Sequence, residues 1–122
     1  MSDVLFSLWP KYIDKILSGE KTVELRTRQV NILPGTNIWF YATTPRMQIE
    51  AKATITEVLI ATPRKIWTLH KDSIAISRTE YNNYVQEREL VTAIKFNNIQ
   101  GIEYPPSLDT IKKEIVLFFM KR

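Results

Sequence analysis

The apolar residues at the start of the chain first form a strand-like run and then recur at helical spacing. The segment 4–9 is rich in β-branched and aromatic residues, and Pro10 then removes a backbone donor, so this segment is predicted to be a short strand. Gly19 suits the left-handed position that follows the last turn of a helix. Between them, four apolar residues recur at helical spacing: Tyr12, Ile13, Ile16 and Leu17. The pattern therefore predicts a strand over 4–9 and a helix over 11–18.

Later segments follow the two-residue period of a strand or form short apolar runs. The longest alternation slips in phase near Val58, as a β-bulge would produce in a strand that bends round a barrel. Five further strands are predicted in this way, over 22–26, 38–42, 48–60, 90–96 and 114–120.

Two short helices are predicted between the later strands. Thr62 and Pro63 suit the cap and first position of a helix that continues past Leu69. Ser77 and Glu80 have the spacing of a capping box in front of a second helix that reaches Val85. A further helical turn is predicted over 107–111. About six short or bent strands with small helices around them favour a single α+β domain over 1–122, built on a small mixed β-barrel.

Composition excludes several kinds of chemistry. Of the 122 residues none is Cys and one is His, so a thiolate nucleophile, a disulfide framework and a site with several imidazoles are ruled out. We therefore expect neither a metal site nor a cofactor. The longest apolar run, over 115–120, is too short to cross a bilayer, and the first residues lack the features of a signal peptide. A cytoplasmic protein without a membrane partner is expected.

The net charge is compatible with a nucleic-acid partner but does not identify one. Lys and Arg number 17 against 13 Asp and Glu, which gives a formal charge of +4. Basic residues supply most of the non-specific affinity for nucleic acids, although many other proteins are equally basic. The segment 63–71 has no acidic residue and carries Arg64, Lys65 and Lys71. It suits either a helix that follows a phosphate backbone or an ordinary solvated helix.

The charged residues around the third predicted element have two interpretations. Glu24, Arg26 and Arg28 share one face by the two-residue period, and Lys21 stands at the entrance of the strand. One interpretation is a solvated sheet face, whose exposed ion pairs contribute about 0–1 kcal/mol each. The other is a polar cleft in which Glu24 orients the two neighbouring cations toward an anion or a nucleobase.

The first half of the chain resembles the ASCH domain, a family of the PUA-like superfamily. The resemblance lies in a strand that ends at Pro10, a helix, a segment of the form Ser/Ala-Gly-x-Lys-x-x-Glu-x-Arg over 18–26, a Pro-Gly turn at 34–35 and a strand that ends in Tyr-Ala at 41–42. The resemblance implies a PUA-like barrel with a cleft against the first helix. It also implies RNA binding, or in some members catalysis on RNA or on N(4)-acetylcytidine.

The leading hypothesis is an RNA- or nucleotide-binding domain, monomeric or weakly dimeric. Trp9 and Tyr41 lie at strand ends beside the motif, with Ser7 and Thr43 as nearby hydroxyls. The predicted binding residues are therefore Ser7, Trp9, Lys21, Glu24, Arg26, Arg28, Tyr41 and Thr43.

The alternative is a small, metal-independent enzyme with Lys21 and Glu24 as catalytic residues. In the ribonuclease form, Lys21 or Arg26 would stabilise the phosphorane and Glu24 or His70 would move the proton. Because two cations beside Glu24 favour its ionised form, it suits an orienting role better than that of a base. The amidohydrolase branch has Thr in place of Glu24 and a further Glu where this chain offers Asp72, which counts against deacetylation. A closed or filled cleft would instead favour a protein-interaction module.

Overall fold

The structure is a computed structural model that describes residues 3–107, 109 and 115–118. Short helices interrupt the series of strands, as the sequence predicts. In chain order the elements are β1 (Asp3–Leu8), α1 (Pro10–Leu17), β2 (Val23–Arg26), β3 (Asn37–Ala42), β4 (Gln48–Ala61), α2 (Pro63–Ile74), α3 (Arg78–Val85), β5 (Val91–Gly101) and β6 (Ile115–Phe118).

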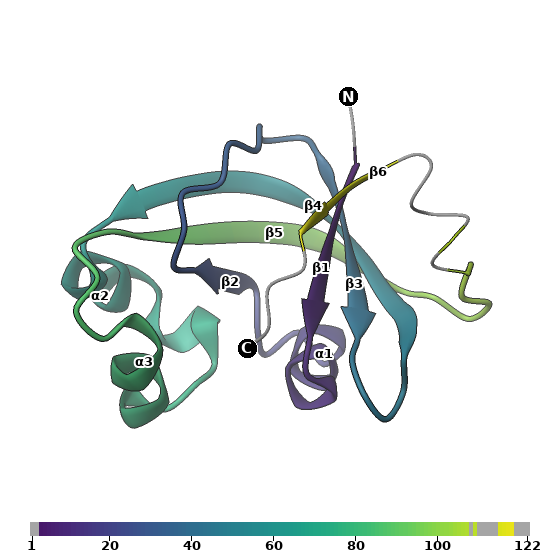
Figure 1. Ribbon diagram of the computed structural model, residues 1–122, viewed down its shortest axis with the longest axis horizontal. Helices are drawn as coiled ribbons and strands as arrows, with labels where there is room; N and C mark the ends of the chain where they lie inside the picture. The colour runs from purple at the N-terminus through teal and green to yellow at the C-terminus, as the bar shows by residue number, and fades with distance from the viewer. Residues whose placement is uncertain (1–2, 108, 110–114, 119–122) are drawn as a thin grey trace.

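The strands form one mixed sheet in the order β2-β5-β4-β3-β1-β6. β1 runs parallel to both of its neighbours, β3 and β6, while the other pairs are antiparallel. Figure 1 shows β4 and β5 curving across the molecule as a half-barrel. The predicted α+β class is confirmed. The predicted barrel is an open half-barrel in the described part of the chain, with β2 and β6 at its edges.

The larger hydrophobic core lies between the sheet and the helices. Phe6 and Phe40 come from the sheet, while Ile13, Ile66 and Tyr81 come from α1, α2 and α3 respectively. All three helices therefore share one core with the sheet. No helix among the described residues is long and apolar enough to span a membrane.

A smaller core covers the other face of the sheet. Leu5 and Ile49 form its centre, with Trp39 and Tyr41 packed against them. Successive side chains of a strand point to opposite faces, so β1 supplies Phe6 to one core and Leu5 to the other. The two faces of the sheet are thus separated environments, which matters for the site.

The strands β1 to β4 begin and end within one residue of their predicted bounds, whereas β5 is longer than predicted. The register of β4 against β5 shifts between Ile55 and Glu57, just before the predicted phase slip at Val58. β5 continues to Gly101 instead of ending at residue 96, because backbone pairing with β4 holds exposed polar residues such as Gln100 in the ladder. Most of the predicted turn over 107–111 and the ends of the predicted strand over 114–120 lie outside the described residues.

The predicted helix caps are confirmed. Thr62 Oγ1 accepts a hydrogen bond from the Lys65 amide at 3.2 Å, and Ser77 Oγ accepts one from the Glu80 amide at 3.1 Å. At the end of α2, Ala75 adopts a left-handed conformation with φ 59, and the Lys15 ammonium donates to its carbonyl at 2.6 Å. This contact links α1 to the end of α2.

We expect Ser77→Ala to lower the free energy of unfolding by about 0.5–2 kcal/mol, because the first turn of α3 loses its side-chain acceptor. Thr79→Ala is the matched control, since Thr79 is exposed in the same turn and is not the cap residue. Urea denaturation of both variants measures the difference. Equal stability of the two variants would contradict the capping role.

Candidate functional site

Lys21, Glu24 and Arg26 form a buried ion network. The Glu24 carboxylate lies between the two cations, 3.3 Å from Lys21 Nζ through Oε1 and 3.3 Å from Arg26 Nη2 through Oε2. All three side chains are 0% exposed. The solvated sheet face considered from the sequence is therefore wrong. These charges also lie in the interior and not on an open cleft wall.

The network joins several elements of the fold. The Lys21 ammonium donates to the carbonyls of Val23 and Ile74, each at 3.0 Å, and so links β2 to the end of α2. The Arg26 guanidinium lies 4.2 Å from the centre of the Phe6 ring, on the side of the larger core. Desolvating three charges is costly, so their close approach and these added contacts are needed to keep them inside the protein.

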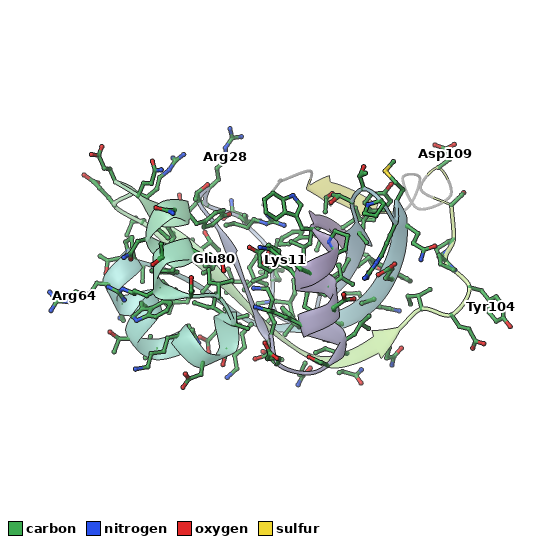
Figure 2. The ribbon with its side chains drawn as sticks, turned by 90° about the horizontal axis from the view of Figure 1, so that it is seen from below. Lys11, Arg28, Arg64, Glu80, Tyr104 and Asp109 are labelled. Carbon is green, nitrogen blue, oxygen red and sulfur yellow. The ribbon has the colours of Figure 1, made fainter. Side chains whose placement is uncertain are left out.

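Arg28 does not join the network. β2 ends at Arg26, and Arg28 is exposed, with its side chain pointing away from the ribbon in Figure 2. Its carbonyl accepts a hydrogen bond from Thr92 Oγ1 at 2.9 Å. The expectation that all four charges converge fails here because the two-residue period applies only while the chain stays in the strand.

The sheet separates Ser7 and Tyr41 from the ion network. They are register partners on β1 and β3, and Tyr41 packs against the smaller core. Since Ser7 follows Phe6 along the strand, it faces away from the side that Arg26 occupies. Thr43 lies just past β3, where its amide donates to the Leu8 carbonyl at 2.9 Å. The structure therefore does not gather the eight predicted binding residues into one cleft, and their binding roles stay predictions.

A second group of polar and aromatic side chains lies between α1 and α3. We call Trp9, Lys11, Tyr12 and Glu80 the α1–α3 face. The Tyr12 hydroxyl donates to Glu80 Oε2 at 2.9 Å, and Lys11 Nζ lies 3.8 Å from the same oxygen. Figure 2 shows Lys11 and Glu80 near each other at the centre of the molecule.

The α1–α3 face combines aromatic rings with a lysine. Trp9 is 46% exposed and stacks on Tyr12 with 6.1 Å between ring centres and 13° between the planes. Lys11 Nζ lies 5.3 Å from the centre of the Trp9 ring and 5.0 Å from that of Tyr12. A nucleobase can stack on an exposed indole while an ammonium meets its phosphate, so this arrangement suits a single-stranded nucleic acid.

Tyr12 connects the α1–α3 face to the buried network. Its ring centre is 5.7 Å from the Lys21 ammonium, and its hydroxyl holds Glu80. The hydrogen bond from Tyr12 lowers the pKa of Glu80, with further help from the charges of Lys11 and Lys15 and against a smaller effect of burial. Glu80 is therefore an ionised acceptor at neutral pH.

The sequence indicated the α1–α3 face only in part. Glu80 was predicted as the last residue of a capping box, three positions after Ser77, and a hydrogen bond from the Ser77 backbone helps to lower its pKa. No local pattern shows that a carboxylate in the first turn of α3 meets a tyrosine 68 positions earlier. The polar character of Tyr12, at an otherwise apolar helix position, is the one signal available.

The described residues contain no group of three or more His, Asp or Glu side chains placed to hold a metal ion. His70, which the sequence offered as a proton carrier, lies in α2 and is partly exposed. It belongs neither to the ion network nor to the α1–α3 face.

Comparisons with known proteins agree with this architecture. Residues 1–116 match a family model described as "Domain of unknown function (DUF365)". A protein of Zymomonas mobilis named ASCH domain-containing ribonuclease is 30% identical over 111 residues, which is 91% of this chain and 74% of that protein. The chain belongs to the ASCH domain family. The family resemblance found in the sequence is thus confirmed.

Solved structures support the same assignment. The crystal structure of ASCH from Zymomonas mobilis superposes on this ASCH domain with a TM-score of 0.81 at 30% identity, over 89% of this chain and 76% of that one. A protein of Enterococcus faecalis gives a TM-score of 0.58 at 14% identity, over 83% of this chain and 77% of that one. The second likeness concerns the fold alone.

We expect Glu24→Gln to destabilise this ASCH domain by roughly 3–5 kcal/mol, because two buried cations would then face a neutral amide. Glu20→Gln, an exposed substitution four residues earlier, is the matched control and should change stability by less than about 0.5 kcal/mol. Guanidinium denaturation measures both. Equal stability of E24Q and the parent protein would show that the carboxylate does not hold the network together.

Proposed function

We propose that this ASCH domain binds single-stranded RNA at the α1–α3 face. The observation that carries the proposal is that an exposed tryptophan and a lysine share one surface, which Tyr12 joins to the buried ion network. The name of the Zymomonas mobilis relative supports RNA as the class of ligand. Nucleotide binding at this face follows from the same chemistry.

In this proposal Trp9 and Lys11 make the direct contacts. A base stacks against the exposed part of the Trp9 ring, and the Lys11 ammonium meets the neighbouring phosphate. Lys21, Glu24 and Arg26 act from below as positioning residues. Their fixed charges hold Tyr12, and through its hydroxyl Glu80, in place.

The finer predictions from the sequence belong to the same proposal. The half-barrel is taken to be PUA-like, and residues 1–122 to form one domain that works in the cytoplasm as a monomer or weak homodimer. The shared core of the three helices and the sheet supports the single domain.

A second candidate function is RNA cleavage, which the name of the relative favours. In the simplest reaction the ribose 2′-oxygen attacks the adjacent phosphorus and passes its proton to a carboxylate. The bond from phosphorus to the 5′-oxygen breaks, that oxygen takes a proton from water, and a 2′,3′-cyclic phosphate forms. Glu80 is the exposed carboxylate that suits the first proton transfer, with Lys11 beside it to offset phosphate charge.

The sequence predicted Lys21 and Glu24 as the catalytic residues of an enzyme. In this candidate reaction they have a different role. Because both are 0% exposed, we assign them to positioning Tyr12 and not to contact with the substrate. Incubation with N(4)-acetylcytidine distinguishes the amidohydrolase alternative, for which release of acetate is the signal.

We expect Trp9→Ala to weaken binding of a short single-stranded RNA by about 1–3 kcal/mol, a factor of roughly 5 to 150, because one base loses its stacking surface. Tyr104→Ala is the matched control, since Tyr104 is an aromatic that is 84% exposed and lies far from the α1–α3 face in Figure 2. Fluorescence anisotropy with labelled RNA measures both variants.

The same titration is repeated over a salt series. Affinity of the parent protein should fall as salt rises, because phosphate contacts release counterions. No binding by the parent protein at low salt would overturn the proposed function. Equal losses in W9A and Y104A would remove Trp9 from it.

If the protein cleaves RNA, Tyr12→Phe should move the acidic limb of the pH–rate profile to higher pH. The Tyr12 hydroxyl lowers the pKa of Glu80, so its removal lets that pKa rise and the carboxylate protonate earlier as pH falls. Tyr104→Phe, a hydroxyl deletion at an exposed tyrosine far from the α1–α3 face, should leave the profile unchanged. An unshifted limb in Y12F would exclude Glu80 as the base.

A further inference from the structure

The flank of α3 that faces away from α1 lines a second, separate concavity. Glu80 turns toward Lys11, while Arg78, Asn82 and Gln86 recur every four positions on another side of the helix. Figure 2 places Arg64, at the start of α2, at the outer end of the helices and away from Lys11 and Glu80. These residues border a pocket of about 470 Å³ between α2 and α3.

The donors of this pocket are cationic and amide groups. They come from Arg64, Arg78, Asn82 and Gln86, while Tyr81 and Val85 add apolar surface to the same lining. No carboxylate lines the pocket, and within the part of the chain that the structure describes neither arginine forms an ion pair. A concave site with two guanidinium groups and no acid suits an anion with several oxygens.

Trp67, which packs against the lining residue Tyr81, holds Arg78 in position. Its guanidinium lies 4.8 Å from the centre of the Trp67 ring, and Trp67 packs on Tyr81 with 4.8 Å between ring centres. The Tyr81 hydroxyl donates to the Pro63 carbonyl, which joins α3 to the first residue of α2. Burial raises the pKa of Tyr81 to about 12, so this hydroxyl stays protonated and keeps donating. A guanidinium held against an aromatic ring in this way loses little freedom when it binds a ligand.

The rim of the pocket contains a strained backbone position. Gln86 ends α3 with φ 37 and ψ −121, a conformation that side chains other than glycine rarely adopt. Its amide donates to the Asn82 carbonyl at 2.9 Å, so the two amide residues of the pocket are held together. Strain of this kind gathers at ligand-binding sites, where the surrounding structure maintains it.

We propose that the pocket between α2 and α3 binds a phosphodiester group of the same RNA strand that the α1–α3 face holds. This inference rests on the proposed function for its ligand. α3 lies between the two sites, with Glu80 on one flank and Asn82 on the other, so a single strand that crosses α3 meets both. The pocket adds affinity and fixes the orientation of the bound RNA strand, but it does not recognise bases, since its donors suit phosphate oxygens.

Only one of the three Lys and Arg residues of the basic segment over 63–71 lines the pocket. Arg64 lines the pocket, whereas Lys65 and Lys71 are exposed and do not border it. A general basic coat would use all three equally. The pocket model assigns a specific role to Arg64 alone, and this difference supplies the controls.

The first experiment compares matched variants in RNA binding. Asn82→Asp places a carboxylate in the pocket and should weaken binding of a single-stranded RNA at least about fivefold at low salt. Asn83→Asp, one position away and outside the pocket, should change the affinity less than twofold.

The double variant Arg64→Gln with Arg78→Gln should lower the slope of log affinity against log salt by about 1.4, because two phosphate contacts are lost. Lys65→Gln with Lys71→Gln removes the same charge as control. Thermal denaturation confirms that each variant folds.

The second experiment locates the binding without relying on RNA function. Titration of the ¹⁵N-labelled protein with pyrophosphate should shift the Trp67 indole and the Asn82 and Gln86 side-chain amide signals, and N82D should abolish these shifts. RNA that binds the parent protein with unchanged affinity in N82D and in the double glutamine variant would overturn the pocket while leaving the proposed function intact. Pyrophosphate shifts without any RNA binding would overturn both, and would show a site for small anions only.

Discussion

The Glu24 carboxylate, held between two buried cations, is the interaction on which the site depends. β2 is a four-residue edge strand that is buried on both faces, and its polar side would be unfavourable in the core without mutual neutralisation. Lys21 also donates a hydrogen bond to the Ile74 carbonyl at the end of α2, and the Arg26 guanidinium packs on Phe6 of β1. Three parts of the chain that are distant in sequence are therefore fixed by one carboxylate. Loosening it would release the strand and the helix above it together.

From this centre the structure extends outward by single contacts. The Lys21 ammonium faces the Tyr12 ring, the Tyr12 hydroxyl holds Glu80, and Glu80 attracts Lys11 at the surface. The Tyr12 side chain thus connects the buried ion network to the polar groups at the surface. Such an arrangement keeps the surface groups in place while a ligand binds, because their partners are themselves held by packing. α3 adds a second surface on its other flank, where the charges are all of one sign.

Local patterns predicted the elements well and the site in part. Thr62 and Ser77 were identifiable as caps because capping depends on residues three positions apart. The motif around Lys21, Glu24 and Arg26 was likewise visible, since its members lie on one short strand. Its burial was not, because that depends on α2 and β1 closing over it. Ser7 and Tyr41 were placed beside the motif by their strand ends, yet the pleat turns them to the opposite face. The meeting of Tyr12 with Glu80 depends on how α1 and α3 pack, which no local spacing encodes.

The pairing of β1 with β6 has a consequence for how the protein is made. Val4 lies beside Val116 in parallel register, so a strand near one end of the sequence is completed by a strand near the other. During synthesis, β1 and β3 can pair early, but one side of β1 stays open until residue 118 has left the ribosome. An open edge with apolar side chains is a template for wrong pairing. The nascent chain therefore keeps this edge of β1 unpaired while all the residues between β1 and β6 are made, and slow synthesis of that segment would prolong the exposure.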